Sequence, residues 1–143
     1  MMVHRLLLLL TMLLPAMGLA QSKLDADTVI QDLVSQGDAA AEAYRPETGL
    51  DTMDSFSGLY FDVFEATGLE VAVGMKDPAL KARVESLFGE VIGLAGQGAP
   101  KTKIVAAWVN LRADITGDVQ ALFADQDISF SGLAIAAGQA PSR

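Results

Sequence analysis

DPALKARVESLFGEVIGLAG, residues 77–96, is the stretch that decides the fold class. Asp77 is a residue type that caps helix N-termini, and a proline such as Pro78 is favoured at the first helical position. Apolar residues then recur at intervals of three and four, namely Leu80, Val84, Leu87, Phe88, Val91, Ile92 and Ala95. This spacing predicts an amphipathic helix that buries one side against other elements.

Helices are also predicted at the two ends of the domain. Apolar residues at helical spacing from Ala26 to Tyr44 predict a first helix, which ends before Pro46. A last helix is predicted over about 101–124, where Gly117 weakens it by about 1 kcal/mol relative to alanine without ending it. Each of these segments has an apolar side that needs a partner.

A further helix is predicted to start near Asp51, but its end is ambiguous. It either stops at Gly68 or continues to Gly74, and the LEVAV stretch between these glycines also alternates like a short strand. Four amphipathic helices joined by short loops bury their apolar sides most simply by packing side by side. The sequence therefore predicts an all-α fold, an antiparallel four-helix bundle.

The chain opens with MMVHRLLLLLTMLLPAMGLAQS, in which the segments of a secretory signal peptide follow one another in their usual order. A basic start at Arg5 is followed by an apolar run over 6–14, Pro15 and small residues, so we expect residues 1–20 to be a cleaved signal peptide. The run is shorter than the roughly 20 apolar residues of a membrane span, although an uncleaved anchor is the alternative. The expected product is a soluble periplasmic protein without stable membrane insertion.

Cleavage would leave one small domain, since the 143 residues less these 20 are 123. We expect a helical bundle domain over 21–124 and a loosely ordered tail over 125–143. The exported part would have no cysteine and no histidine, because His4 is the only histidine of the chain. Haem attachment, zinc sites built on thiolate or imidazole, and cysteine or Ser-His nucleophiles would therefore lack their atoms.

Acidic residues are concentrated in the first half of the exported part. Between Asp25 and Glu70 there are 11 acidic residues and a single basic one, Arg45, whereas from Val71 onward seven acidic residues meet seven basic ones. Such a field repels nucleic acid and attracts cations or a basic partner protein. The alternative is an acidic surface that serves only solubility.

Three of these acidic residues fall in one sector of the predicted second helix. At about 100° per residue, Asp54, Asp62 and Glu65 lie opposite the apolar stripe. Gly58 lies in the same sector and adds no side chain that would shield these carboxylates from an ion. Carboxylate oxygens are the ligands of hard cations, so Asp54, Asp62, Glu65 and Glu70 are the candidate metal ligands. An ordinary solvated helix face is the alternative interpretation.

Glu70 differs from the other three, because an unbroken helix would place it on the apolar stripe. A buried carboxylate needs a partner or a proton. Arg112 lies on the apolar side of the last predicted helix, so we expect Glu70 inside or at the rim of the bundle, paired with Arg112 or bound to metal. The alternative is that Gly68 breaks the helix and that Glu70 and Arg112 both reach solvent.

The runs DSFSGLYFDVFEATGLEVAVG (54–74), DPALKARVESLFGEVIGLAGQGAP (77–100) and AAWVNLRADI (106–115) resemble one known family. It is the extracytoplasmic N-terminal region of bacterial high-affinity iron permeases of the Ftr type, together with its small secreted relatives. The resemblance covers roughly 30–122 and implies a role in iron handling outside the cytoplasmic membrane. The chain lacks the Arg-Glu-x-x-Glu motif of that family's membrane helices, so transport itself is not implied.

Two functions are therefore expected as alternatives. The first is a periplasmic accessory domain of iron uptake, whose carboxylates bind or guide ferrous or ferric iron toward an iron permease or another membrane component. The second is a metal-free acidic module that docks on a basic partner protein. We expect no enzymatic activity, because one tryptophan and two tyrosines do not furnish an aromatic-lined substrate cleft.

Overall fold

The computed structural model of the chain describes residues 25–124. The expected signal peptide, residues 1–20, and the expected tail, residues 125–143, lie outside the described residues. Within 25–124 the fold is all-α, as predicted, and this part contains no strand. None of its helices is long and apolar enough to cross a membrane.

The helices have the following bounds. They are α1 (Ala26–Ala43), the short 3-10 turn η1 (Pro46–Thr48), α2 (Gly49–Gly58), the π-helical segment η2 (Leu59–Glu65), α3 (Leu69–Lys76), α4 (Pro78–Gly96), α5 (Lys101–Asp114), the π-helical segment η3 (Ile115–Val119) and α6 (Gln120–Phe123). Segment η2 continues α2 without a break, and η3 and α6 continue α5 in the same way.

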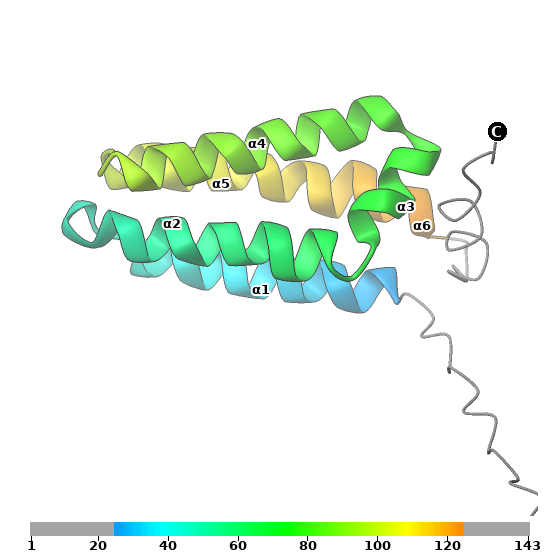
Figure 1. Cartoon of the computed structure of the whole chain (residues 1–143), viewed down its shortest axis with the longest axis horizontal. Helices are drawn as coiled ribbons and strands as arrows, with labels where there is room; N and C mark the ends of the chain where they lie inside the picture. Colours follow the sequence, from blue (N-terminus) through cyan, green and yellow to red (C-terminus); the bar gives the residue numbers. More distant parts are fainter. Residues whose placement is uncertain (1–24, 125–143) are drawn as a thin grey trace, which may run out of the picture.

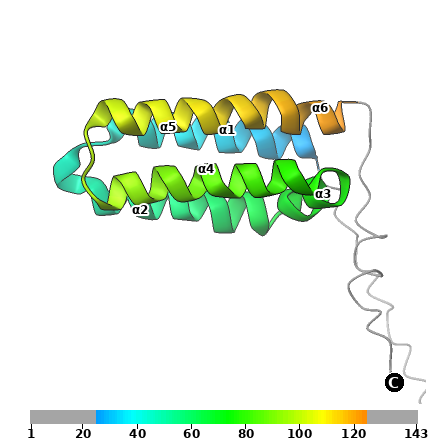
Figure 2. The ribbon, with the colours of Figure 1, turned by 90° about the horizontal axis from the view of Figure 1, so that it is seen from above.

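The long helices are arranged in two layers (Figure 1). Helix α4 lies over α2, α5 lies over α1, and these neighbours contact one another along their lengths (Figures 1 and 2). The short helix α3 lies at one end of the molecule, which is also the end where α6 finishes. This end carries the features described below.

Capping residues explain two of the helix starts. Asp25 accepts a hydrogen bond from the backbone N–H of Thr28 (3.2 Å) at the start of α1, and Asp77 accepts one from Leu80 (2.9 Å) at the start of α4. Pro78 occupies the first turn of α4, as the sequence predicts. Side-chain acceptors satisfy N–H groups that have no partner inside the helix, which fixes where each helix begins.

Gly68 ends the second predicted helix. It has a φ of 85°, in the left-handed region that glycine adopts at no steric cost. The chain turns there and starts α3 at Leu69, so the alternatives of an unbroken helix to Gly74 and of a short strand are both wrong. The sequence did not predict the π segment η2, in which the Ala66 N–H donates to the carbonyl of Phe61, five residues back (3.0 Å).

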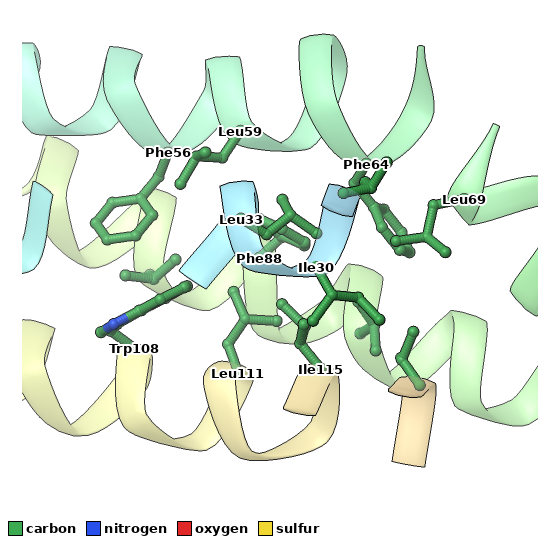
Figure 3. Close-up of a cluster of buried hydrophobic side chains, with 14 of the residues drawn as sticks. Ile30, Leu33, Phe56, Leu59, Phe64, Leu69, Phe88, Trp108, Leu111 and Ile115 are labelled. Carbon is green, nitrogen blue, oxygen red and sulfur yellow. The ribbon is translucent and has the colours of Figure 1, made fainter. Parts of the chain in front are cut away.

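The core is formed by apolar side chains from every long helix. Phe56, Leu59 and Phe64 point from α2 and η2 toward Trp108, Leu111 and Ile115, with Ile30, Leu33 and Phe88 between them (Figure 3). Helix α1 approaches α5 closely at Gly37, where an added Cβ would lie 2.1 Å from the Trp108 ring. Only glycine fits beneath this ring, which fixes the distance between the two helices.

Candidate functional site

The structure places the four predicted metal ligands in two different environments. Asp54, Asp62 and Glu65 are exposed on α2 and η2, whereas Glu70 on α3 is buried, with 9 % of its surface exposed. A Cβ on Gly58 would lie 3.6 Å from Asp62 Oδ2, so this carboxylate lies beside the glycine. Within 25–124, no three or more acidic side chains are grouped closely enough to hold a metal ion ready-made.

Glu70 pairs with Lys81 instead of Arg112. Lys81 Nζ lies 2.8 Å from Glu70 Oε1 and 3.4 Å from Glu85 Oε1, so two carboxylates share one ammonium group. The predicted Glu70–Arg112 pair is wrong, because the turn at Gly68 redirects α3 so that Glu70 faces α4 and not α5. Burial of Glu70 itself is confirmed.

Arg112 has a different partner on another helix. Its guanidinium lies 3.4 Å from Asp38 Oδ1 on α1, and the same carboxylate oxygen accepts a hydrogen bond from Trp108 Nε1 (2.7 Å). Asp38 thus connects α1 to two residues of α5. Arg112 is therefore paired with α1, whereas Glu70 is paired with α4.

Tyr60 completes the surroundings of Glu70, and we call Tyr60, Glu70, Lys81 and Glu85 the Glu70 cluster. The Tyr60 ring packs edge-on against Phe88, with 5.4 Å between ring centroids. Burial raises the pKa of the Tyr60 phenol, and the negative charges of Glu70, Glu85 and Glu65 raise it further, while Lys81 opposes them. The phenol is therefore protonated at neutral pH.

The charges inside the cluster stabilise one another. The hydrogen bond from Lys81 lowers the pKa of Glu70, and this outweighs the opposing effect of burial; the positive charge of Lys81 lowers it further. The hydrogen bond with Glu70 likewise raises the pKa of Lys81, although its burial acts in the opposite direction. Glu70 and Lys81 are consequently both ionised across the neutral range.

Two glycines shape the site. Gly68 sets the direction of α3, and Gly74, one turn after Glu70, leaves room for the aliphatic stem of Lys81. A Cβ on Gly74 would lie 2.7 Å from Lys81 Cδ. Lys81 and Glu85 were not among the predicted site residues, although their spacing of four residues on a predicted helix is a signal for an ion pair. Their proximity to Glu70 depends on the turn at Gly68.

A second group of charges has a structural explanation. Arg83 on α4 donates to Asp114 at the end of α5 and to Asp118 in η3, so it ties these segments together. Arg83 is half exposed, as is Asp118, and the group faces water. Because surface ion pairs of this type are common and weak, we do not regard it as a functional site.

The fold and the site define a class of protein: an all-helical domain with an acidic exposed side and a buried carboxylate held by a lysine. Comparison with protein-family models, with curated proteins and with solved structures finds no match. The function is therefore argued from the Glu70 cluster and the acidic side of the molecule.

Chemically, the Glu70 cluster is a place where two carboxylates hold one cation. In the structure the cation is the Lys81 ammonium. The two carboxylates and the Tyr60 phenol would offer only oxygen donors to a metal ion, which is the ligand set that hard cations prefer. A metal could use these donors only after Lys81 moves aside.

Proposed function

We propose that this chain is an exported accessory domain of iron handling, an antiparallel four-helix bundle with α3 inserted, which works in the periplasm beside an iron permease or another membrane component. It binds or guides iron through carboxylates without transporting it and without catalysing a reaction. The observation that carries the proposal is the Glu70 cluster, in which Glu70 and Glu85 hold a single cation next to a phenol. The resemblance to the Ftr-type domain supports the choice of iron.

The chemistry of the donors favours a hard cation. Ferric iron prefers carboxylate and phenolate oxygen, and Tyr60, Glu70 and Glu85 supply these groups on three different segments, η2, α3 and α4. Without metal the raised pKa of Tyr60 keeps the phenol protonated. Binding of iron through Tyr60 would therefore release a proton and produce the visible absorption of a ferric phenolate.

The Lys81 ammonium can be exchanged for a metal ion. Its side chain is 33 % exposed, against 12 % for that of Glu70, so the flexible stem can carry the ammonium into water when a metal ion replaces it. Neighbouring carboxylates repel each other when no cation lies between them. Lys81 thus supplies the positive charge between Glu70 and Glu85 when no metal is bound, and iron would compete with it. The exposed Asp54, Asp62 and Glu65 would attract cations toward α2 and η2.

Iron titration of the exported protein tests the proposal directly. Ferrous iron under anaerobic conditions and ferric iron supplied from a weak chelator are titrated into the wild type and into E70Q/E85Q. Saturable binding is expected in the wild type and at least a tenfold weaker affinity in the variant. The matched control is E90Q, an exposed glutamate on the same helix as Glu85. Equal iron binding by all three proteins would contradict the proposed metal role. Iron binding by a D62A/E65A/E70A variant that equals the binding by the wild type would contradict it as well.

A metal-free interaction module is the second candidate, and a specific observation favours it. Lys81 already satisfies Glu70 without metal, while the acidic residues of α1, η1 and α2 form an exposed acidic surface. The exposed acidic residues of this surface include Asp27, Asp32, Glu47, Asp51 and Asp54. Capture of a basic partner that weakens with salt but not with metal chelation would support this function. Capture that disappears on chelation would support the iron proposal.

A further inference from the structure

Helix α3 has an outer face that is apolar and exposed. Val71 is 47 % exposed and Met75 63 % exposed, and their spacing of four residues puts them on one side of the helix. The opposite side is buried, with Leu69 and Val73 in the core and Glu70 against α4. Helix α3 therefore presents two adjacent large apolar side chains to the outside, which is the property of a docking face.

This face lies beside the point where the chain leaves the described residues. Helices α3 and α6 lie at the same end of the molecule in both views (Figures 1 and 2). Lys76, the residue after Met75, has its Nζ 5.5 Å from the centroid of the Phe123 ring. The last turn of α3 thus contacts the end of α6, and Ala124, the last described residue, directly follows Phe123.

The segment that follows has the composition to cover such a face. Its 19 residues, 125–143, contain the run ISFSGLAIAA, with large apolar side chains at Ile128, Phe130, Leu133 and Ile135. Ile128 lies four positions after Ala124, and extended chain covers about 3.3 Å per residue, or roughly 13 Å over this length. Because α3 is adjacent to Phe123, this length is enough to bring the apolar run over Val71 and Met75.

We propose that the C-terminal segment docks through Ile128, Phe130 and Leu133 on the Val71–Met75 face of α3. This contact covers the outer side of the helix whose inner side carries Glu70. The proposal does not depend on iron binding.

A second exposed apolar pair provides a control surface. Val105 and Val109 on α5 are 38 % and 52 % exposed, respectively. Both valines lie at least 14 residues before Phe123 on the continuous helix formed by α5, η3 and α6, so this pair is the matched control surface.

Paramagnetic relaxation enhancement tests the docking on the full exported chain. The chain has no cysteine, so a nitroxide on S131C is the single label. Docking predicts strong broadening of the amide signals of α3, Leu69–Lys76, and little broadening around Val105 and Val109. Broadening of α3 should be lost in V71S/M75S and kept in V105S/V109S. Broadening at Val105 and Val109, or at neither pair, would overturn the proposal.

A mixed sample separates docking within one chain from docking between copies. Labelled chain without 15N is mixed with 15N-labelled chain that carries no nitroxide, and α3 signals should remain sharp. Broadening in this mixture would show that the segment reaches a second copy and would contradict the proposal.

Oxidation of Met75 by peroxide is an independent readout of docking. Peroxide should oxidise Met75 at least threefold faster in I128S/F130S/L133S than in the wild type. Met53, which is packed against the core, serves as the internal reference. Equal rates would also contradict docking.

Discussion

At the scale of single residues, Glu70 shows how a buried carboxylate is kept ionised. A charge removed from water costs several kcal/mol unless a partner compensates it. Lys81 supplies that partner at 2.8 Å, and because its own side chain stays partly exposed, most of its desolvation cost is avoided. The pair therefore allows a carboxylate to lie beside the core without taking up a proton.

Replacing Lys81 by methionine should destabilise the protein in a pH-dependent manner. The pKa of Glu70 is lowered in the fold from an ordinary value of 4.5, so its contribution to stability is present above that value and is lost as the pH falls through the lowered pKa. We expect K81M to lose about 2 kcal/mol of unfolding free energy at neutral pH. The difference from the wild type should shrink once Glu70 is protonated.

Urea denaturation at pH 7 and at an acidic pH measures this difference, which should narrow as the pH falls through the lowered pKa of Glu70. K103M, at an exposed lysine of α5, is the control and should stay within about 0.5 kcal/mol of the wild type at both. The Tyr60 pKa should rise further in K81M, because Lys81 lowers it in the wild type. A loss that is independent of pH would mean that the Lys81 stem, and not its charge, stabilises the fold.

At the scale of helices, the sequence predicts those segments whose ends are encoded locally. The start of α4 follows from Asp77 with Pro78, and the structure confirms it. The first helix was predicted from apolar spacing that begins at Ala26, and α1 begins at this residue. The end of the second helix was left open, because Gly68 is compatible with a helix that continues and with one that stops. Local patterns carry no information on which of these the packing selects.

The site was predicted less completely than the fold, for a related reason. Burial of Glu70 followed from its place among apolar residues, but its partner depends on the direction of α3 after Gly68. An unbroken helix would have directed Glu70 toward Arg112. The π turn in η2 also shifts the residues after Phe61 relative to an ideal helix, and an angular projection at 100° per residue cannot include this shift.

Two glycine-to-alanine substitutions test the role of the turn at Gly68. G68A forces a residue with a Cβ into the left-handed region and should cost about 1–2 kcal/mol. G89A is the matched control, because Gly89 lies inside α4 with nothing within 4 Å of an added Cβ. It should stabilise the protein by about 0.5–1 kcal/mol through helix propensity. Thermal or urea unfolding measures both, and a neutral or stabilising G68A would contradict the role assigned to this turn.

At the scale of the whole molecule, charge is distributed unequally between the two pairs of helices. The segment from Asp25 to Glu70, which forms α1, α2 and η2, carries 11 acidic residues and one basic residue, and most of these acids are exposed. Glu85 of α4 and Asp114 of α5 instead pair with Lys81 and Arg83. One side of the molecule therefore repels itself, and this self-repulsion is the electrostatic cost of any cation-attracting function.

Screening this repulsion should stabilise the protein, and this gives a prediction for the molecule as a whole. Raising NaCl from about 0.02 M to about 0.3 M shortens the Debye length from roughly 20 Å to roughly 6 Å, which is less than the width of a helix. We expect the unfolding temperature to rise by about 3–5 °C.

The variant D51N/D54N/D62N neutralises three exposed carboxylates of α2 and η2 and tests the origin of this rise. Its rise in unfolding temperature with salt should be about half as large as in the wild type. Its unfolding temperature at low salt should be higher than that of the wild type. An unfolding temperature that falls with salt would show that ion pairs such as Arg83–Asp114 outweigh the repulsion, in which case the acidic side would not produce the field that both proposed functions require.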